Sequence, residues 1–224
     1  MSDTPNQFEK HIDVNKNDFL AVDLLAAETG LSKQKIKQVM QQGAVWLTRG
    51  KKTQRLRRAK KALRAGETLH IYFDSHVLAI APPEPTLIMD AGQYSVWNKP
   101  YGMLSQGSKW GDHCTITRWA EQHLSPQRPS FVVHRLDRAA NGLIIVAHAK
   151  RAAAALSELF QKRKIDKRYQ IWVHGHFDVQ ATAENPTRIE SEIDGRHAVS
   201  YFTLIEYDED YDRSLLDVAI ETGR

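Results

Sequence analysis

The sequence predicts an α+β protein in which a small N-terminal α/β domain is joined to a larger domain built on a mostly antiparallel mixed sheet with a few helices. Three observations predict this fold class. Two helical patterns precede a pair of strands, a proline-rich stretch follows, and short apolar runs bounded by turn residues then recur along the chain. We expect a flexible tail over 1–17, in which 11–14 alternates enough to pair as an edge strand, and then segments at 18–74, 75–85 and 86–224.

The N-terminal domain begins with two predicted helices. Apolar residues recur at helical spacing up to Gly30, which ends the first helix. Ser32 caps the second helix and Gly43 ends it, with an apolar stripe that predicts a buried face and three lysines that lie off the stripe. Strands are expected at 44–47 and 69–73.

Charge is unevenly distributed along the chain. Of the 31 Lys and Arg residues, 12 lie between Lys33 and Arg64, a segment without Asp or Glu, which leaves 19 basic and 27 acidic residues elsewhere. Such segregation is costly through self-repulsion unless a polyanion offsets it, so it favours nucleic acid as a partner. A solvated charged surface is the alternative interpretation.

The order of elements over residues 18–74 resembles the S-four RNA-binding domain: two short helices, a Gly turn, a strand, and a Gly-Glu turn into another strand. In that domain the second helix and the following loop track the RNA backbone. The resemblance therefore implies phosphate contacts by Lys33, Lys35, Lys37, Lys51, Lys52, Arg55, Arg57 and Arg58.

The segment 75–85 contains Pro82, Pro83 and Pro85, a composition that favours extended conformations and predicts a linker. The larger domain follows this linker. Strands are predicted at 87–89, 94–97, 169–174, 189–193, 199–205 and 214–220, with a hairpin turn at Asp194-Gly195. Helices are predicted at 115–124 and at 150–162, the latter burying Ala153, Leu156, Leu159 and Phe160.

The central stretch, residues 131–147, consists of two apolar runs that enclose a charged loop. Each run is short, β-branched and bounded by turn residues, so both runs predict buried strands. The loop carries His134, Arg135, Asp137 and Arg138, and unpaired charges are costly away from water. Because a carboxylate held between arginines stays ionised near neutral pH, we place the chemistry at Asp137.

This stretch resembles the signature of the RluA-type pseudouridine synthases, which is His-Arg-Leu-Asp, two variable residues, a Thr/Ser pair, Gly and an apolar strand. Residues 134–137 and Gly142 match, whereas Ala140 and Asn141 depart from the Thr/Ser pair. The resemblance implies that Asp137 is catalytic in the isomerisation of uridine to pseudouridine in RNA, a reaction that needs no cofactor. Attack on the sugar and proton removal to give a glycal both require an ionised carboxylate buried beside cationic groups.

Two further segments are similar to motifs of the same family. Asn98 to Gly102 is similar to its Asn/Asp-Lys-Pro-x-Gly motif, although an ordinary strand-ending turn is the alternative. Lys167-Arg168-Tyr169 resembles its Lys-x-Tyr element, which implies that Tyr169 stacks on a flipped target base while Arg135 fills the gap; a core aromatic is the alternative. Base-stacking or site-supporting roles are thus implied for Tyr169, Arg135, His134, Lys99 and Lys167.

The last four residues, Glu221-Thr222-Gly223-Arg224, match the opening of the family's third motif. In the family that motif continues with Thr-His-Gln-Ile-Arg, and a basic residue of the continuation pairs with the catalytic Asp. We therefore expect either a fragment of a longer protein or a truncated form with a catalytic domain that is incomplete at its C-terminus.

Composition argues against several other classes. The single Cys114 excludes an internal disulfide, and neither a secretory leader nor an apolar run of ~20 residues is present, which predicts a soluble cytoplasmic protein. His174 with His176 and His113 with Cys114 are potential ligand pairs, but no zinc-type set of ligands emerges, so we expect no metal.

The predicted partner is RNA. Large-subunit ribosomal RNA is favoured because this pairing of domains resembles synthases that act there, and transfer RNA is the alternative. No obligate protein partner is evident, and we expect a monomer. Two rival functions are a non-catalytic RNA-binding protein and, ranked last, a glycoside hydrolase, which requires a second carboxylate in partnership with Asp137.

Overall fold

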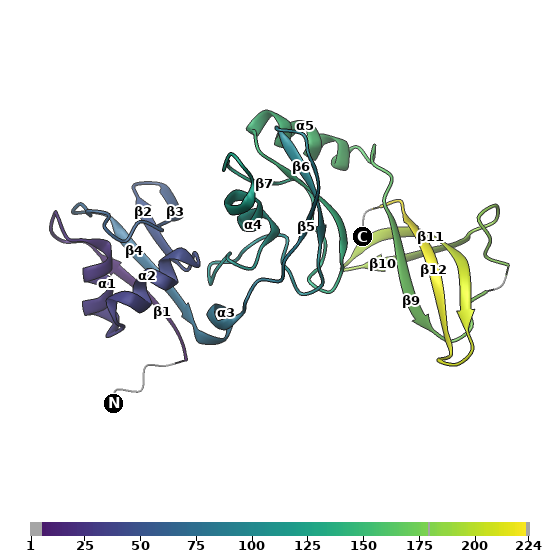
Figure 1. Ribbon diagram of the computed structural model, residues 1–224, viewed down its shortest axis with the longest axis horizontal. Coiled ribbons are helices and arrows are strands. Elements are labelled where there is room, and N and C mark those ends of the chain that lie inside the picture. Colours follow the sequence, from purple (N-terminus) through teal and green to yellow (C-terminus); the bar gives the residue numbers. More distant parts are fainter. Residues whose placement is uncertain (1–5, 179, 223–224) are drawn as a thin grey trace. The chain divides into compact units, whose positions relative to one another are not determined.

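The computed structural model describes residues 6–178 and 180–222. Over those residues it is α+β as predicted, with five helices and three four-stranded sheets whose paired strands are all antiparallel (Figure 1). The chain forms two compact units, Met1–Ala154 and Ala155–Arg224. The boundary expected at 75–85 lies inside the first unit, so the division into an RNA-binding and a catalytic domain stays a prediction.

The N-terminal sheet has the order β1-β4-β2-β3. These strands are β1 (Gln7–Asp13), β4 (Thr68–Asp74), β2 (Val45–Arg49) and β3 (Lys52–Arg55). Helices α1 (Ala21–Thr29) and α2 (Lys33–Gln41) share its core (Figure 1). Both predicted helix boundaries are confirmed, because Gly30 has a left-handed φ of 73° and the Ser32 side chain accepts from the Lys35 N–H.

Strand β1 corrects the expectation of a flexible tail. It pairs with β4 along its whole length, from Gln7 opposite Asp74 to Asp13 opposite Thr68, so the edge strand is longer than the sequence indicated. The physical reason is alternation: Ile12 is buried in the core while Glu9 and His11 face outward, which a polar composition conceals. Residues 1–5 of the predicted tail lie outside the described residues.

The predicted linker is also partly regular. Helix α3 (Ser75–Ala79) occupies its first half, because Asp74 accepts from the His76 and Val77 N–H groups and Leu78 is buried. Residues 80–85, which include the prolines, have no helix or strand, as their composition predicted.

The second sheet of the first unit has the order β5-β6-β8-β7. Its strands are β5 (Thr86–Asp90), β6 (Tyr94–Lys99), β7 (Phe131–Val132) and β8 (Gly142–Ala147), and helix α4 (Ile116–His123) precedes β7. In the β6–β8 register Lys99 lies opposite Gly142, so the end of β6 meets the point where the charged loop re-enters the sheet. The two apolar runs are only partly buried, since Leu143 is 64% exposed and Val132 36% exposed.

A buried hydrogen-bond chain crosses this sheet. The Trp97 Nε1–H donates to Ser95 Oγ at 2.7 Å, Ser95 Oγ lies 2.8 Å from His148 Nε2, and His148 Nδ1 lies 2.9 Å from the Pro129 carbonyl. His148 must donate from Nδ1 to that carbonyl, so Nε2 is free to accept from Ser95 only when the imidazole is neutral. Burial accordingly lowers the pKa of His148 from its ordinary value.

Acid should therefore destabilise the first unit. The pKa of His148 is lower in the folded protein than its value of about 6.5 in the unfolded chain. The contribution of His148 to the free energy of unfolding is therefore complete above the unfolded pKa and is lost as the pH falls through the folded pKa. We expect the free energy of unfolding to decline between about pH 7.5 and 5.5, by at most ~1.4 kcal/mol per pH unit for this group. His148→Gln should reduce that slope, leaving the part due to His70, whose pKa burial also lowers. An equal slope in both proteins would contradict this assignment.

The second unit contains a sheet of order β10-β11-β12-β9. The strands are β9 (Arg168–His174), β10 (Thr187–Ile193), β11 (Arg196–Asp208) and β12 (Arg213–Ile220), and the hairpin turns at Asp194-Gly195 as predicted. Helix α5 (Lys150–Gln161) lies where expected, but none of its residues is buried. Its predicted stripe is half-buried at best and Leu159 is 39% exposed, because the described residues leave that face partly uncovered.

Candidate active site

The residues around Asp137 line a pocket of about 270 Å³. One wall comes from the segment after β6, and the other comes from the charged loop between β7 and β8. The lining residues are Leu104, Ser105, Gln106, Gly107, Arg135, Leu136, Asp137 and Arg138. The structure therefore brings the predicted Asp137 and Arg135 to one cavity. Residues 104–107, which the sequence analysis did not single out, also line it.

Two contacts tie these walls together. The buried Ser105 hydroxyl donates to the Leu136 carbonyl at 2.6 Å, and its oxygen accepts from the Leu136 N–H at 3.0 Å. One turn away, the Gly102 N–H donates to the Arg138 carbonyl at 2.8 Å, and Gly102 has a φ of 84° that favours glycine. The backbone on both sides of Asp137 is thus held by hydrogen bonds, although no hydrogen bond from the described residues holds its side chain.

Lys99 holds the same loop through hydrogen bonds from its side chain. Its side chain is completely buried, and its Nζ donates to the carbonyls of Pro100, Met103 and Ala140 at 3.2, 2.9 and 2.6 Å. Burial lowers the pKa of Lys99, and the negative charge of Asp137 opposes that shift. The Lys99 ammonium is therefore buried, uses all three of its donors and interacts electrostatically with Asp137. A supporting role for Lys99 in the site stays a prediction.

His134 holds the start of the loop to β8. The Ile145 N–H donates to His134 Nε2 at 2.9 Å, so this ring nitrogen carries no proton in the observed geometry. His134 thereby anchors the backbone three residues before Asp137.

The structure corrects the environment that we expected for Asp137. Its side chain is exposed, as are those of Arg135 and Arg138, and among the described residues no ion pair within 4.0 Å joins it to either arginine. A short charged loop at the rim of a sheet projects such side chains into solvent, where arginines gain little by pairing. The negative charge of Asp137 does act on Lys99, whose pKa it raises against the effect of burial.

Tyr169 and Lys167 belong to the second unit. Tyr169 is the second residue of β9, lies opposite Val218 of β12 and is half-buried, while the Lys167 carbonyl accepts from the Ile220 N–H. Burial and the charge of Arg163 lower the pKa of Lys167. Thr222, at the opening of the predicted third motif, accepts from the Val199 N–H at 3.1 Å; Gly223 and Arg224 lie outside the described residues.

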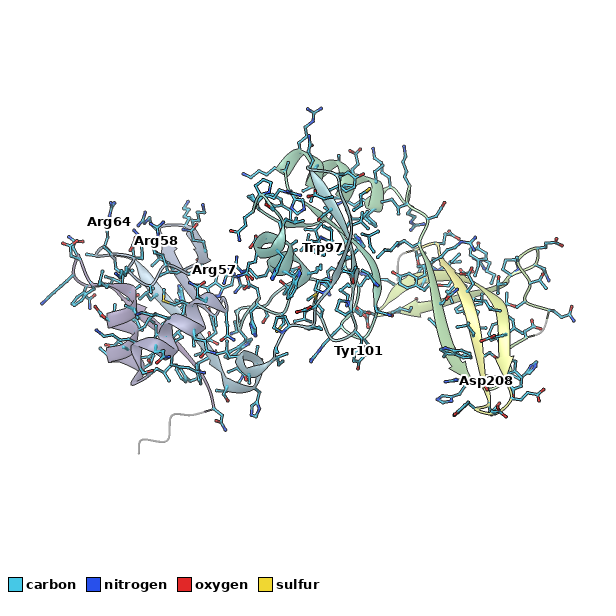
Figure 2. All side chains as sticks on the ribbon, in the orientation of Figure 1. Arg57, Arg58, Arg64, Trp97, Tyr101 and Asp208 are labelled. Carbon is cyan, nitrogen blue, oxygen red and sulfur yellow. The ribbon has the colours of Figure 1, made fainter. Side chains whose placement is uncertain are left out.

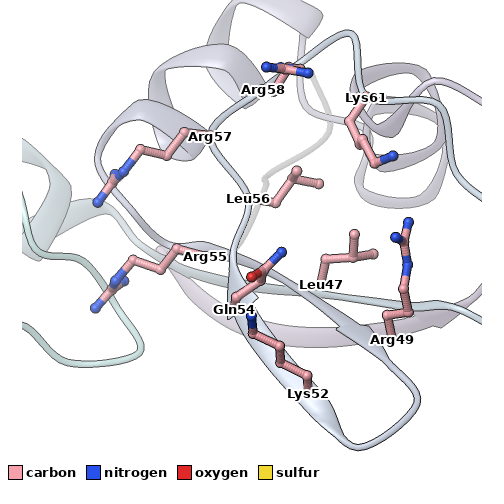
Figure 3. Close-up of a pocket in the computed structure, with 9 residues that line it drawn as sticks. All are labelled: Leu47, Arg49, Lys52, Gln54, Arg55, Leu56, Arg57, Arg58 and Lys61. Carbon is pink, nitrogen blue, oxygen red and sulfur yellow. The ribbon is translucent and has the colours of Figure 1, made fainter. Parts of the chain in front are cut away.

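A second, strongly basic pocket of about 400 Å³ lies on the N-terminal sheet (Figure 3). It is lined by Leu47, Arg49, Lys52, Gln54, Arg55, Leu56, Arg57, Arg58 and Lys61. Figure 3 shows that Arg55 and Arg57 project to one side, away from Arg49 and Lys61.

The eight predicted phosphate contacts differ in their surroundings. Lys37, Lys51, Lys52 and Arg58 are exposed, and no ion pair is found for them among the described residues. By contrast, Lys33 lies 2.7 Å from Asp23, and Arg55 and Arg57 both contact Asp112. The segment's lack of acids concealed these partners, since Asp23 and Asp112 lie before and far beyond it in the sequence. Lys35 contacts Gln38 at 3.3 Å.

Two properties of the described residues concern the remaining predictions. Over 6–178 and 180–222, no cluster of three or more His, Cys, Asp and Glu side chains has the arrangement of a metal site. Within the same residues, no helix has the length and apolar character needed to cross a bilayer.

Comparison with known proteins gives a consistent result. The family model for RNA pseudouridylate synthases matches residues 93–224. An RNA pseudouridine synthase of Chloroflexus aurantiacus is 29% identical over 90% of this chain, and the dual-specificity RNA pseudouridine synthase RluA of Escherichia coli is 31% identical over 56% of it. The chain spans 66% and 62% of the lengths of these two relatives.

A solved structure of the human protein RNA pseudouridylate synthase domain containing 1 is similar in fold. It aligns with a TM-score of 0.52 and 17% identity, covering 65% of this chain and 64% of that one. At this identity the likeness concerns the fold alone.

Proposed function

Since the chain belongs to the RNA pseudouridylate synthase family, of the RluA type, we propose that it isomerises uridine to pseudouridine in RNA and that Asp137 is its catalytic group. One observation carries the proposal: an exposed carboxylate stands in a pocket whose two walls are hydrogen-bonded to each other over a buried lysine ammonium. A reactive group that is accessible on a fixed backbone is what a reaction at a sugar carbon requires.

The reaction exchanges one bond to the ribose for another. The bond from C1′ to N1 of the uracil breaks, the base turns in the pocket, and C1′ joins C5; the proton lost from C5 is balanced by one gained at N1. No electrons are transferred to or from another molecule. Asp137 either attacks C1′ or removes a proton to give a glycal, and both routes use its ionised form. Substrate that closes over the pocket would remove water from this carboxylate and strengthen its coupling to Lys99.

The target base must leave its stack to reach an enzyme pocket. We assign Tyr169 to stacking on the extruded base and Arg135 to filling the gap that it leaves, because an aromatic face and a planar guanidinium suit these two tasks. The exposed position of Arg135 at the rim of the Asp137 pocket supports its part of this assignment.

Structured RNA is the proposed partner, and ribosomal RNA of the large subunit is favoured. Transfer RNA is the alternative, and the Escherichia coli relative is itself described as dual-specificity. The basic pocket and the exposed lysines of the N-terminal domain support a general affinity for phosphate rather than a choice between these RNAs. A monomeric state and a cytoplasmic location belong to the same proposal.

The decisive test compares cells with and without the gene by sequencing chemically derivatised pseudouridines. Loss of one or more sites in large-subunit ribosomal RNA is expected, and their return on expression of the parent but not of Asp137→Asn would assign them to this site. Loss confined to transfer RNA would overturn the preferred substrate. A pseudouridine map that does not change would favour the non-catalytic RNA-binding alternative.

The exposed basic residues should set the salt dependence of RNA binding. Replacing Lys51, Lys52 and Arg58 together with Gln should weaken binding to all RNA sequences and flatten the plot of log affinity against log salt by about 0.7 per lost contact on single strands. Lys16→Gln, an exposed lysine outside the basic segment, is the control and should leave the slope unchanged. A triple variant with the parent's slope would remove these residues from the RNA interface.

A further inference from the structure

The segment 105–112 connects the Asp137 pocket with the N-terminal sheet. Its base is closed where the Leu104 N–H donates to the Cys114 carbonyl at 3.0 Å and the Ile116 N–H donates to the Leu104 carbonyl at 2.9 Å. Ser105, at its start, holds the Asp137 loop, whereas its far part lies against residues that are about 60 positions earlier in the sequence. We call residues 105–112 the bridging segment.

The tip of the bridging segment is bound to the outer face of the N-terminal sheet. The Trp46 Nε1–H donates to the Lys109 carbonyl at 3.1 Å, and Lys109 Nζ lies 2.6 Å from Glu9 and 4.8 Å from the centre of the Tyr72 ring. The Trp110 ring meets the Tyr72 ring edge-on, with 5.8 Å between centroids. Contacts from β1, β2 and β4 thus converge on two neighbouring residues.

Asp112 closes this interface electrostatically. Its carboxylate contacts Arg57 and lies 3.1 Å from Arg55 Nε, and the three side chains are only 15%, 22% and 18% exposed. Arg55 also donates to the Ser108 carbonyl at 2.7 Å, and the Asp112 N–H donates to the Gln42 carbonyl at 3.0 Å. Arg57, labelled in Figure 2, is thus joined to a residue 55 positions later in the sequence.

A cluster of this kind is sensitive to the loss of one member. Arginines that are mostly withdrawn from water depend on their counter-ion, so removing Asp112 leaves two like charges close together without a partner. Burial lowers the pKa of Arg55 and the nearby Arg57 lowers it further, while Asp112 opposes both effects. Asp112 therefore holds together two groups that would otherwise repel each other.

The packing around Asp112 leaves no spare room. A Cβ added at Gly43 would lie 2.3 Å from Asp112 Oδ1, and Gly43 has a φ of 82°. On the other side, a Cβ at Gly107 would lie 2.5 Å from the Asp112 Cβ. The two glycines allow the bridging segment to approach the N-terminal domain closely.

We propose that Asp112 is a positioning residue for the Asp137 pocket: by pairing with Arg55 and Arg57 it fixes the bridging segment, so that the N-terminal domain helps to shape the active site as well as to bind RNA. This inference rests on the proposed function. The path is short: Asp112 fixes the end of the segment, Gly107 packs on Asp112, and Gln106 and Ser105 form the wall that holds Leu136 beside Asp137.

The first experiment measures catalysis and RNA binding in the full protein for Asp112→Asn, Arg57→Gln and the double variant. Asp112→Asn should lower kcat by between about tenfold and a hundredfold with little change in RNA affinity, because it disturbs the pocket wall and not the exposed basic residues. The double variant should be no worse than Asp112→Asn alone, since both changes break one interaction. Asp23→Asn, which breaks the exposed pair with Lys33, is the matched control and should leave kcat unchanged.

A second experiment compares two Gly→Ala variants. It distinguishes a steric clash with Asp112 from the general cost of placing alanine at a positive φ. Gly43→Ala and Gly66→Ala place a side chain at nearly the same φ, 82° and 85°, but only at Gly43 does the new Cβ meet Asp112, and nothing lies within 4 Å of the one at Gly66. Gly43→Ala should therefore reproduce the loss of kcat seen in Asp112→Asn. Gly66→Ala should lose stability only.

Hydrogen exchange supplies a readout that does not depend on activity. In Asp112→Asn, amides in 104–107 and 134–138 should exchange faster, Leu136 in particular, because its N–H is held by Ser105. Unchanged exchange together with an unchanged kcat would overturn the inference, and so would a fall in RNA affinity alone. If the parent itself made no pseudouridine, the proposed function would fail, and the exchange result alone would decide whether Asp112 fixes the pocket wall.

Discussion

Asp137→Asn should reduce pseudouridine formation to background while RNA affinity and thermal stability stay close to those of the parent. The substitution keeps the shape of the side chain and removes only its charge. Because the Asp137 side chain is exposed and the loop is held by the backbone contacts of Leu136 and Arg138, folding does not depend on that charge. We expect a change in Tm of no more than about 2 °C, since exposed substitutions are usually within ±0.5 kcal/mol.

The measurement is the single-turnover conversion of a target RNA by the full-length protein, and RNA affinity is measured in a separate experiment. Tyr169→Phe provides a graded comparison: it retains the ring for stacking and loses only the hydroxyl, so its defect should be milder. If Asp137→Asn converted RNA at the parent's rate, the chemistry would have to be placed elsewhere in the chain.

Lys99→Met should have the second largest effect, and unlike Asp137→Asn it should affect both folding and chemistry. The variant leaves the carbonyls of Pro100, Met103 and Ala140 without their shared donor. Each buried acceptor without a partner costs about 1–3 kcal/mol. Because the surrounding backbone can relax in part, we expect the free energy of unfolding to fall by ~2–4 kcal/mol in total. Activity should fall by at least roughly a hundredfold, because the turn after β6 and the Asp137 loop separate and the buried cation that interacts with the charge of Asp137 is lost.

Chemical denaturation measures the first effect, and kcat well below the unfolding midpoint of the variant measures the second. Lys150→Met, at an exposed lysine that begins α5, is the control and should change neither. A Lys99→Met protein that is less stable but fully active when folded would show that Lys99 supports the fold without shaping the site.

The elements that the sequence predicted well are those whose boundaries depend on local chemistry. The Ser32 cap, the left-handed Gly30 and the Asp194-Gly195 turn act within a few residues of their own position, so a pattern in the chain is enough to find them. The strand β1 was underestimated because its pairing with β4 depends on residues some 60 positions away.

The candidate site shows the same division. The short string around Asp137 indicated the pocket, but Ser105 and Asp112 could not be found in advance, because a lone serine or aspartate in a polar loop has no distinctive spacing. Their roles arise from contacts across 31 and 55 residues of sequence. The exposure of Asp137 was likewise missed, since a count of neighbouring arginines does not reveal in which direction each side chain points.

The place of β1 has a consequence for any attempt to isolate the N-terminal domain. A fragment that began at residue 18 would lack β1 and would leave the β4 backbone, from Thr68 to Asp74, as an unpaired edge beside apolar residues such as Ile71 and Phe73. Exposed edges of that length recruit strands from other molecules, whereas β1 presents Glu9, Lys10 and Asp13 at the margin of the sheet. The first strand thus acts as a guard against aggregation, and a soluble fragment has to begin before Gln7.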